Sequence, residues 1–238
     1  MTSLPWFDDA GAPARRDGLS RERVVAAAVA AADADPHRDV TMRDLAGDLG
    51  VRSPMALYRW VGGSKTGLHD LMADAVYAEM TVPDDAGWRA GLRGLGESAW
   101  AAVGRHPWFA RLAFSRPPLG PHALAVHDRA LALLDGHDLD AATRMGCVST
   151  VLGHVLGAGL ALLEETAMRA RTGLTTERDL SDAAQPYLDR IAASGRYPHF
   201  SAWAADPGRL APPPQTVERT LGWLLDGLAG TIEGRADG

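Results

Sequence analysis

The amino-acid sequence predicts an all-α protein. Apolar residues recur at the spacing of α-helices along most of the chain, and beyond residue 83 no stretch alternates in the manner of a β-strand. Near the N-terminus, residues 41–65 show the pattern of two short helices joined by a tight turn, the sequence form of a helix-turn-helix. Hydrophobic residues make up 46% of the chain and charged residues 23%, which is enough apolar surface for a globular core.

The first of the two short helices is predicted by an apolar stripe and by residues suited to its ends. The stripe consists of Met42, Leu45, Ala46 and Leu49. Thr41 stands just before it, where a hydroxyl accepts a hydrogen bond from a free backbone N–H group. Gly50 follows the stripe, where the chain leaves a helix most cheaply through a left-handed conformation.

The second short helix is expected to begin beside Ser53 and Pro54. Ser53 is a suitable cap, and proline is tolerated at the first helical position because its missing N–H has no partner there. We expect Met55, Tyr58 and Val61 to pack this helix on the first. The other side then presents Pro54, Ala56 and Arg59 to solvent.

Cations and hydroxyls surround this outward face. Arg43 lies in the first turn of the first helix, Arg52 precedes the second helix, and Lys65 opens the next one. Tyr58 has a ring to bury and a hydroxyl to leave at the surface. Such groups around a short helix suit a DNA major groove flanked by phosphates. The alternative is a helical hairpin whose charged face is merely solvated.

Residues 41–65, with helices on both sides, resemble the DNA-binding domain of the tetracycline-repressor (TetR) family of transcriptional regulators. The matching residues are Thr41, Arg43, Leu45, Ala46, Leu49, Gly50, Val51, Leu57, Tyr58, Val61, Lys65 and Leu68. The resemblance implies that Thr41, Tyr58 and Lys65 hold phosphates and that Arg43 reaches a base. We expect the other base-facing residues to be Arg52, Ser53, Pro54, Met55, Ala56 and Arg59. The spans 51–58 and 61–65 are each one residue longer than the usual family pattern.

The chain divides into three predicted parts. Residues 1–18 are expected to be a flexible arm, 19–82 a DNA-binding domain, and 83–238 a helical domain for ligand binding and dimerisation. Within the second part, we expect Ser20 to cap a supporting helix that runs to about Asp35, and we expect a fourth helix to run from near Ser64 toward Pro83. Further helices are expected at about 88–105, 108–114, 123–134, 141–169, 180–193, 197–205 and 215–233.

The long helix at 141–169 is apolar nearly all round, so we expect it to be buried on most sides. Each glycine costs a helix about 1 kcal/mol relative to alanine, so its four glycines require a reason, and close approach of another helix is the obvious one. They are Gly146, Gly153, Gly157 and Gly159. This helix and the last one are the predicted homodimer interface, with packing inside one monomer as the alternative.

Aromatic and mildly polar residues in the second half are candidates for lining an effector pocket, since small-ligand sites combine such groups. The candidates are Trp100, Trp108, Phe109, Phe114, Met145, Thr150 and His154, with Cys147 and Leu152 beside them. For each one taken singly, ordinary core packing is the competing interpretation.

Composition and motifs narrow the remaining classes. We expect no cofactor and no metal, because HExxH, Cys/His cluster, Walker and GxGxxG patterns are absent from the sequence.

The single cysteine, Cys147, fits a reducing cytoplasm, and the longest apolar run, at 151–163, is too short to cross a bilayer. Net charge is −6, yet residues 14–65 carry nine Lys/Arg against seven Asp/Glu. This modest asymmetry fits a DNA-binding part on an acidic remainder.

The sequence therefore predicts a cytoplasmic, non-enzymatic, homodimeric regulator, of which repressor is the leading form. It would bind palindromic operator DNA and respond to a small, largely apolar effector. Two alternatives stay open at this level. One is a helical enzyme or small-molecule-binding protein, and the other is a helical interaction protein whose N-terminal hairpin is structural.

Overall fold

The computed structural model describes residues 4–6, 19–84, 87–206 and 213–234. Within these ranges every regular element is a helix, and no strand occurs. The helices are α1 (Arg21–Ala34), α2 (Met42–Asp48), α3 (Met55–Tyr58), α4 (Lys65–Tyr77), α5 (Trp88–Arg105), α6 (Phe109–Ser115), α7 (Pro121–Ala132), α8 (Ala141–Thr172), α9 (Glu177–Ala193), α10 (Pro198–Ala204) and α11 (Pro213–Ile232). The all-α prediction is confirmed.

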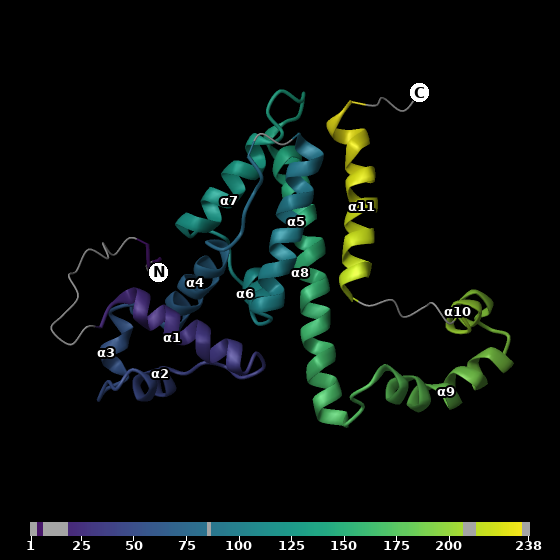
Figure 1. The fold of residues 1–238 in the computed structure, drawn as a ribbon, viewed down its shortest axis with the longest axis horizontal. Helices are drawn as coiled ribbons and strands as arrows, with labels where there is room; N and C mark the ends of the chain where they lie inside the picture. Colours follow the sequence, from purple (N-terminus) through teal and green to yellow (C-terminus); the bar gives the residue numbers. More distant parts are fainter. Residues whose placement is uncertain (1–3, 7–18, 85–86, 207–212, 235–238) are drawn as a thin grey trace.

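Helices α1 to α4 form the head, the part at the lower left of Figure 1. The Ser20 hydroxyl caps α1 by accepting the Arg23 N–H, and the Thr41 hydroxyl caps α2 by accepting the Asp44 N–H. Both caps agree with the sequence-based predictions. Fully buried side chains from all four helices fill the centre of the head: Val24, Ala28, Leu45, Leu57, Val61 and Leu68.

The turn between α2 and α3 differs from the prediction in two respects. The helix starts at Met55, with Pro54 in the capping position and no side-chain cap, so Ser53 does not cap it. Met55 is 72% exposed, whereas Leu57, Trp60 and Val61 are buried. The packing face is therefore offset from the expected Met55–Tyr58–Val61 stripe, because the helix is a single turn whose continuation at 59–63 is non-helical.

Helices α5, α6, α7, α8 and α11 form the body. Helix α8 packs on α5, α6, α7 and α11, and α5 also packs on α11, as Figure 1 shows for the long green helix and its neighbours. One apolar cluster continues from Leu19 in the head to Ile232 in α11. Head and body thus share one hydrophobic core.

Helix α8 is less buried than its composition indicated. It is long and apolar enough to span a membrane by length and composition alone, but 44% of that window is buried inside this fold. Val148, Val151 and Val155 face the core, while Met145, Thr150 and Leu162 are exposed. The expectation of burial on most sides is wrong for a single chain, because one face of α8 is left uncovered by the residues that the structure describes.

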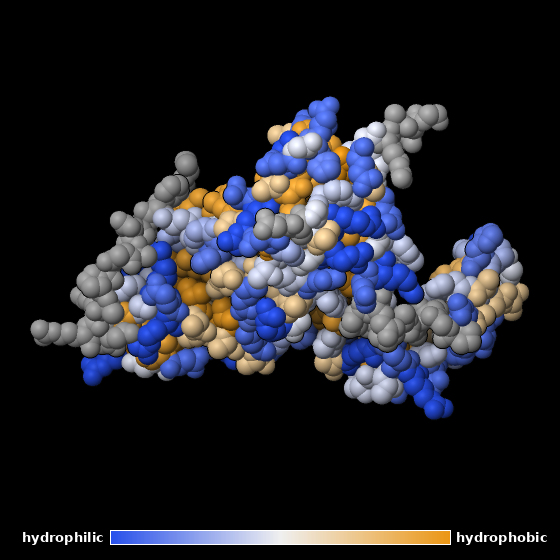
Figure 2. All heavy atoms as spheres, turned by 45° about the horizontal axis from the view of Figure 1, so that its top comes forward, coloured by the Kyte–Doolittle hydropathy of each residue, from blue (hydrophilic) through white to orange (hydrophobic). Residues whose placement is uncertain are grey.

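Helices α9 and α10 form a helical pair that projects away from the body, at the right of Figure 1. A capping box at Thr176 and Asp179 starts α9, and α10 packs back on it. Neither helix buries a residue. Figure 2 shows hydrophilic and hydrophobic residues side by side on this helical pair.

Only one of the four glycines in α8 makes a close contact inside the described chain. A Cβ placed on Gly159 would lie 2.4 Å from Cγ1 of Val103 on α5, whereas one on Gly146, Gly153 or Gly157 would meet nothing within 4 Å. Close helix approach therefore explains Gly159 within this chain. The other three lie where a second helix has room to approach.

We predict that Gly159→Ala lowers the free energy of unfolding by about 1 kcal/mol. Overpacking typically costs about 1–3 kcal/mol and outweighs the gain in helix propensity, which is about 1 kcal/mol. The matched control is Gly104→Ala on α5, where a Cβ meets nothing within 4 Å, and this variant should be stabilised. Urea unfolding followed by circular dichroism measures both. A Gly159→Ala variant as stable as Gly104→Ala would contradict the packing described.

Candidate DNA-binding face and head–body junction

One side of α3 packs against the core of the head, and the opposite side is exposed to solvent. Leu57 and Val61 are fully buried, and Nε of Arg21 donates to the carbonyl oxygen of Trp60 at 3.0 Å. On the opposite side Arg52, Ser53, Met55 and Arg59 are exposed, and Pro54 and Ala56 are half-buried. Every residue predicted to face bases in the turn and in α3 thus lies on accessible surface.

The three arginines of this face form no ion pair within the described part of the chain. Among the described residues, Arg43, Arg52 and Arg59 take part in no salt bridge, although acidic side chains are close by in α2. The Arg59 guanidinium lies over the Trp60 ring at 5.0 Å, which fixes the direction of its side chain. Unpaired arginines around an exposed helix are groups that phosphates and base edges can bind without displacing a protein partner.

Thr41 is engaged at the start of α2. Its hydroxyl donates to Oδ2 of Asp44 at 2.8 Å, and Nη2 of Arg38 donates to the same oxygen at 2.9 Å. The bond from Thr41, followed by the charge of Arg38, lowers the pKa of the Asp44 carboxyl. A phosphate contact by Thr41 therefore exchanges one hydrogen bond for another.

Lys65 is the first residue of α4, and the Ser64 hydroxyl caps that helix by accepting the Gly67 N–H at 3.0 Å. The Lys65 ammonium forms a salt bridge with Asp39, which lies in the loop between α1 and α2. Nε2 of His69 is 3.8 Å from the other Asp39 oxygen. Burial, followed by the charge of Lys65, lowers the pKa of His69, so its ring is neutral at neutral pH. No pattern in the sequence predicts that Asp39 pairs with Lys65, because the two residues are 26 positions apart.

Tyr58 is half-buried and packs against the core cluster. Its carbonyl accepts the Gly63 N–H at 2.8 Å, and Gly63 has the left-handed φ of 74°. This closed turn sets the spacing between α3 and Lys65. The extra residue in the span 61–65 is thereby accommodated as a pair of left-handed glycines, Gly62 and Gly63.

Buried acids of α4 attach the head to the body. Both carboxylate oxygens of Asp70 accept hydrogen bonds from Arg116, at 2.6 Å and 3.0 Å. Asp74 is bonded to Nδ1 of His122 and to the backbone N–H of Ala123, at 2.8 Å and 2.9 Å. Gly120 lies so close that a Cβ there would be 2.2 Å from Asp74 Oδ1. The 116–121 turn is therefore a docking point for α4.

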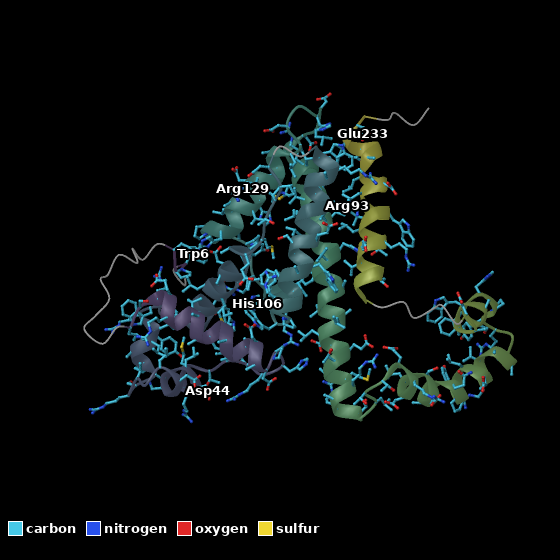
Figure 3. All side chains as sticks on the ribbon, in the orientation of Figure 1. Trp6, Asp44, Arg93, His106, Arg129 and Glu233 are labelled. Atoms are coloured by element: carbon cyan, nitrogen blue, oxygen red, sulfur yellow. The ribbon has the colours of Figure 1, made fainter. Side chains whose placement is uncertain are left out.

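The N-terminal residues 4–6 reach the same region, and the rest of the predicted arm lies outside the described residues. Pro5 is buried, with its Cα 3.0 Å from where a Cβ of Gly62 would lie. Trp6, labelled in Figure 3, lines a small hollow with Asp70, Tyr77 and Arg116.

The residues predicted to line an effector pocket lie in several places rather than around one hollow. Phe109 is fully buried with its ring edge against Tyr77 at 5.3 Å, and burial raises the pKa of that tyrosine to about 12. Nε2 of His154 is 2.8 Å from the Thr220 hydroxyl and so links α8 to α11. The Thr150 hydroxyl bonds the Gly146 carbonyl of its own helix. Of the others, Trp100 is half-buried, Phe114 and Met145 are exposed, and Trp108 is buried at the junction.

Trp108 also lines a crevice of about 210 Å³ between head and body. The crevice is walled by Met72 of α4, Leu112 of α6 and the loop before α2. Its polar residues are His37, Arg38, Asp39, His69 and Arg111. Sequence reasoning missed these residues, because they come from three segments that only the packing of head on body brings together.

The exposed single-turn helix α3 packed on α2, with three arginines around it that pair with no described acid, is the arrangement of a helix-turn-helix. Residues 82–232 match the family model described as the tetracyclin repressor-like C-terminal domain. The chain belongs to the TetR family of transcriptional regulators, whose members are not enzymes and bind operator DNA as dimers.

Two relatives agree with this assignment. The chain is 37% identical over 191 residues to the HTH-type transcriptional repressor DrrR1 of Streptomyces coeruleorubidus, covering 79% of this chain and 70% of DrrR1. It is 31% identical over 230 residues to an HTH-type transcriptional regulator of Saccharopolyspora erythraea, covering 95% of this chain and 91% of the relative. The fold matches ActR of Streptomyces coelicolor in its complex with (S)-DNPA, with a TM-score of 0.75, 24% identity and coverage of 90% and 98%.

We predict that Asp39→Asn tightens DNA binding about threefold to tenfold, because it releases Lys65 and removes a negative charge near the phosphates. Fluorescence anisotropy with labelled operator measures the change. Asp35→Asn, the same charge change at an exposed residue of the same loop, is the control and should have a smaller effect. Equal effects of both substitutions would show that the Asp39–Lys65 pair has no specific influence.

Proposed function

We propose that this protein is a homodimeric, ligand-responsive repressor that binds a palindromic operator through the two copies of α3. The observation that carries the proposal is the exposed face of α3, on which Arg52 and Arg59 form no salt bridge with any described residue while Leu57 anchors the helix. A single helix turn reads few base pairs. Two copies about 34 Å apart read successive major grooves and so supply the missing specificity.

We assign separate roles to the residues of this face. Thr41, Tyr58 and Lys65 hold phosphates and set the position of the head. Arg43, with the base-facing set Arg52, Ser53, Pro54, Met55, Ala56 and Arg59, reads bases. Residues 19–82 form the DNA-binding domain, 83–238 form the ligand-binding and dimerisation domain, and the arm 1–18 precedes both. The protein acts in the cytoplasm, where the operator lies.

The dimer interface is proposed on α8 and α11. Trp223 of α11 is 62% exposed, and Met145 and Leu162 of α8 are also exposed. Gly153 and Gly157 lie on α8 with open space above them. Large exposed apolar side chains next to open glycines are suited to the close approach of a second pair of helices.

The effector is proposed to be small and largely apolar. ActR, which shares this fold, has been crystallised with (S)-DNPA and with actinorhodin. In this chain we propose that the effector binds within the body among the set Trp100, Trp108, Phe109, Phe114, Met145, Thr150 and His154. Binding must favour a head–body arrangement that no longer fits DNA, and a shift from 1:99 to 99:1 requires about 5.5 kcal/mol of differential affinity.

Substitutions on the head test the assigned roles. Lys65→Ala and Tyr58→Phe should weaken binding to all DNA sequences, about tenfold for the lysine, because phosphates carry no sequence information. Arg43→Ala should also reduce the preference for operator over non-operator DNA, because a lost base contact typically costs about 1–3 kcal/mol. Selection of bound genomic fragments by the purified protein identifies the operator for these measurements. Unchanged operator affinity in all three variants would refute the site.

A charge placed on α11 tests the dimer interface. Trp223→Glu should convert the dimer to monomer in analytical ultracentrifugation and weaken operator binding at least tenfold. Leu124→Glu on α7 introduces the same charge at a similarly exposed apolar residue and is the matched control, which should remain dimeric. A dimeric Trp223→Glu protein would place the interface elsewhere.

A further inference from the structure

His106 occupies the corner between α5 and α6 and is buried. Its Nδ1 is 2.8 Å from Oδ1 of Asp33 on α1, and its Nε2 is 3.0 Å from Oε1 of Glu79, just after α4. Figure 3 shows the labelled residue between the head helices and the body. One ring from the body thus contacts carboxylates from two separate segments of the head.

The geometry determines how many protons this ring carries. An ionised carboxylate accepts hydrogen bonds and cannot donate, and a neutral imidazole has a single N–H. Burial raises the pKa of Glu79, but hydrogen bonds from Arg105 and His106 outweigh burial and lower it overall. Oδ1 of Asp33 also accepts the indole N–H of Trp108 at 2.6 Å. Both neighbours of the ring are therefore acceptors, and only the doubly protonated imidazolium satisfies both.

We propose that His106 is a proton-dependent clamp, whose imidazolium fastens α1 and the end of α4 to the body and releases one of them when it loses a proton. The charged groups around it are Asp33 from α1, Glu79 from the segment after α4, and Arg105 from α5. With the imidazolium these four charges balance. Without it, a ring lone pair faces a carboxylate at the junction.

The other attachments of the head do not need this proton. Arg116 stays charged at any physiological pH and holds Asp70 with two hydrogen bonds. His122 contacts one carboxylate oxygen through Nδ1, which a neutral ring can satisfy by donating from that nitrogen. Loss of the His106 proton therefore loosens one edge of the junction while the Asp70–Arg116 pair remains. Histidine is the side chain whose charge ordinarily changes near neutral pH.

The protonation state is tested directly by NMR of protein labelled with ¹⁵N in histidine rings. The spectrum at pH 6 should show hydrogen on both ring nitrogens of His106, and the signal is assigned by its absence in His106→Gln. Rising pH should convert it to a form with one N–H. A His106 ring with a lone-pair nitrogen at pH 6 would overturn the proposal.

The mechanical consequence is tested by hydrogen exchange, corrected for the intrinsic effect of pH. In the wild-type protein, amides of one of the two segments 31–34 and 76–80 should lose about tenfold in protection between pH 6 and pH 8, because a neutral imidazole satisfies only one of the two carboxylates. Amides of α8, which lie away from the clamp, should keep the same protection at both pH values. The control His137→Gln, in the turn after α7, should behave as wild type.

Two variants separate the clamp from a general loss of structure. His106→Gln should have low protection of both segments at either pH. In Asp33→Asn the ring has a single carboxylate, Glu79, to which it must donate a hydrogen bond. This variant should therefore keep the 76–80 segment protected and should abolish the pH dependence of hydrogen exchange. Equal pH dependence in wild type and Asp33→Asn would contradict the clamp. Neither experiment uses DNA, so failure to bind an operator would overturn the proposed function and leave the clamp standing.

Discussion

The pairing of Asp70 with Arg116 is the contact on which the arrangement of the molecule depends. Asp70 is buried on α4, a helix that belongs to the head core and yet packs on α6 and α7 of the body. Removing one partner of a buried ion pair typically costs about 3–5 kcal/mol, because the other charge is left without compensation. The structure therefore resists separation of the two parts at this point.

That constraint explains how a change in the body can reach α3, a helix of the head. Lys65 and Asp70 lie on the same helix, and Asp39 connects the N-terminus of α4 to the loop before α2. Any displacement of the 116–121 turn is carried by α4 to the residue proposed to hold a phosphate. Because one close-packed core continues through head and body, little of the structure between the 116–121 turn and Lys65 can absorb such a displacement.

The sequence was sufficient for features that depend on local chemistry. The caps at Ser20 and Thr41 and the left-handed turn at Gly50 follow from side-chain hydrogen bonding and from the conformational freedom of glycine. The family resemblance placed the candidate DNA-binding residues on one surface. The packing face of α3 was misjudged, because a single helical turn is too short for periodicity to determine its orientation.

Features that depend on long-range packing were not available from the sequence. Nothing near Asp33 indicates that it bonds residues 106 and 108, which are more than seventy positions away. The composition of α8 likewise did not reveal its exposed face. An apolar sequence pattern is the same for a helix that packs within its own chain and for one that packs on a second copy. The candidate pocket residues were chosen by type, and several of them serve contacts between helices instead, as His154 does with Thr220.

The most direct test of the account is a hydroxyl-radical footprint of the dimer on its selected operator. The account predicts two symmetrically related protected tracts whose centres lie about one helical turn apart, roughly 10 base pairs, or a small multiple of it. Both tracts should disappear together when the effector is added. A single protected tract, or protection without two-fold symmetry, would contradict the central claim that two copies of α3 read one duplex.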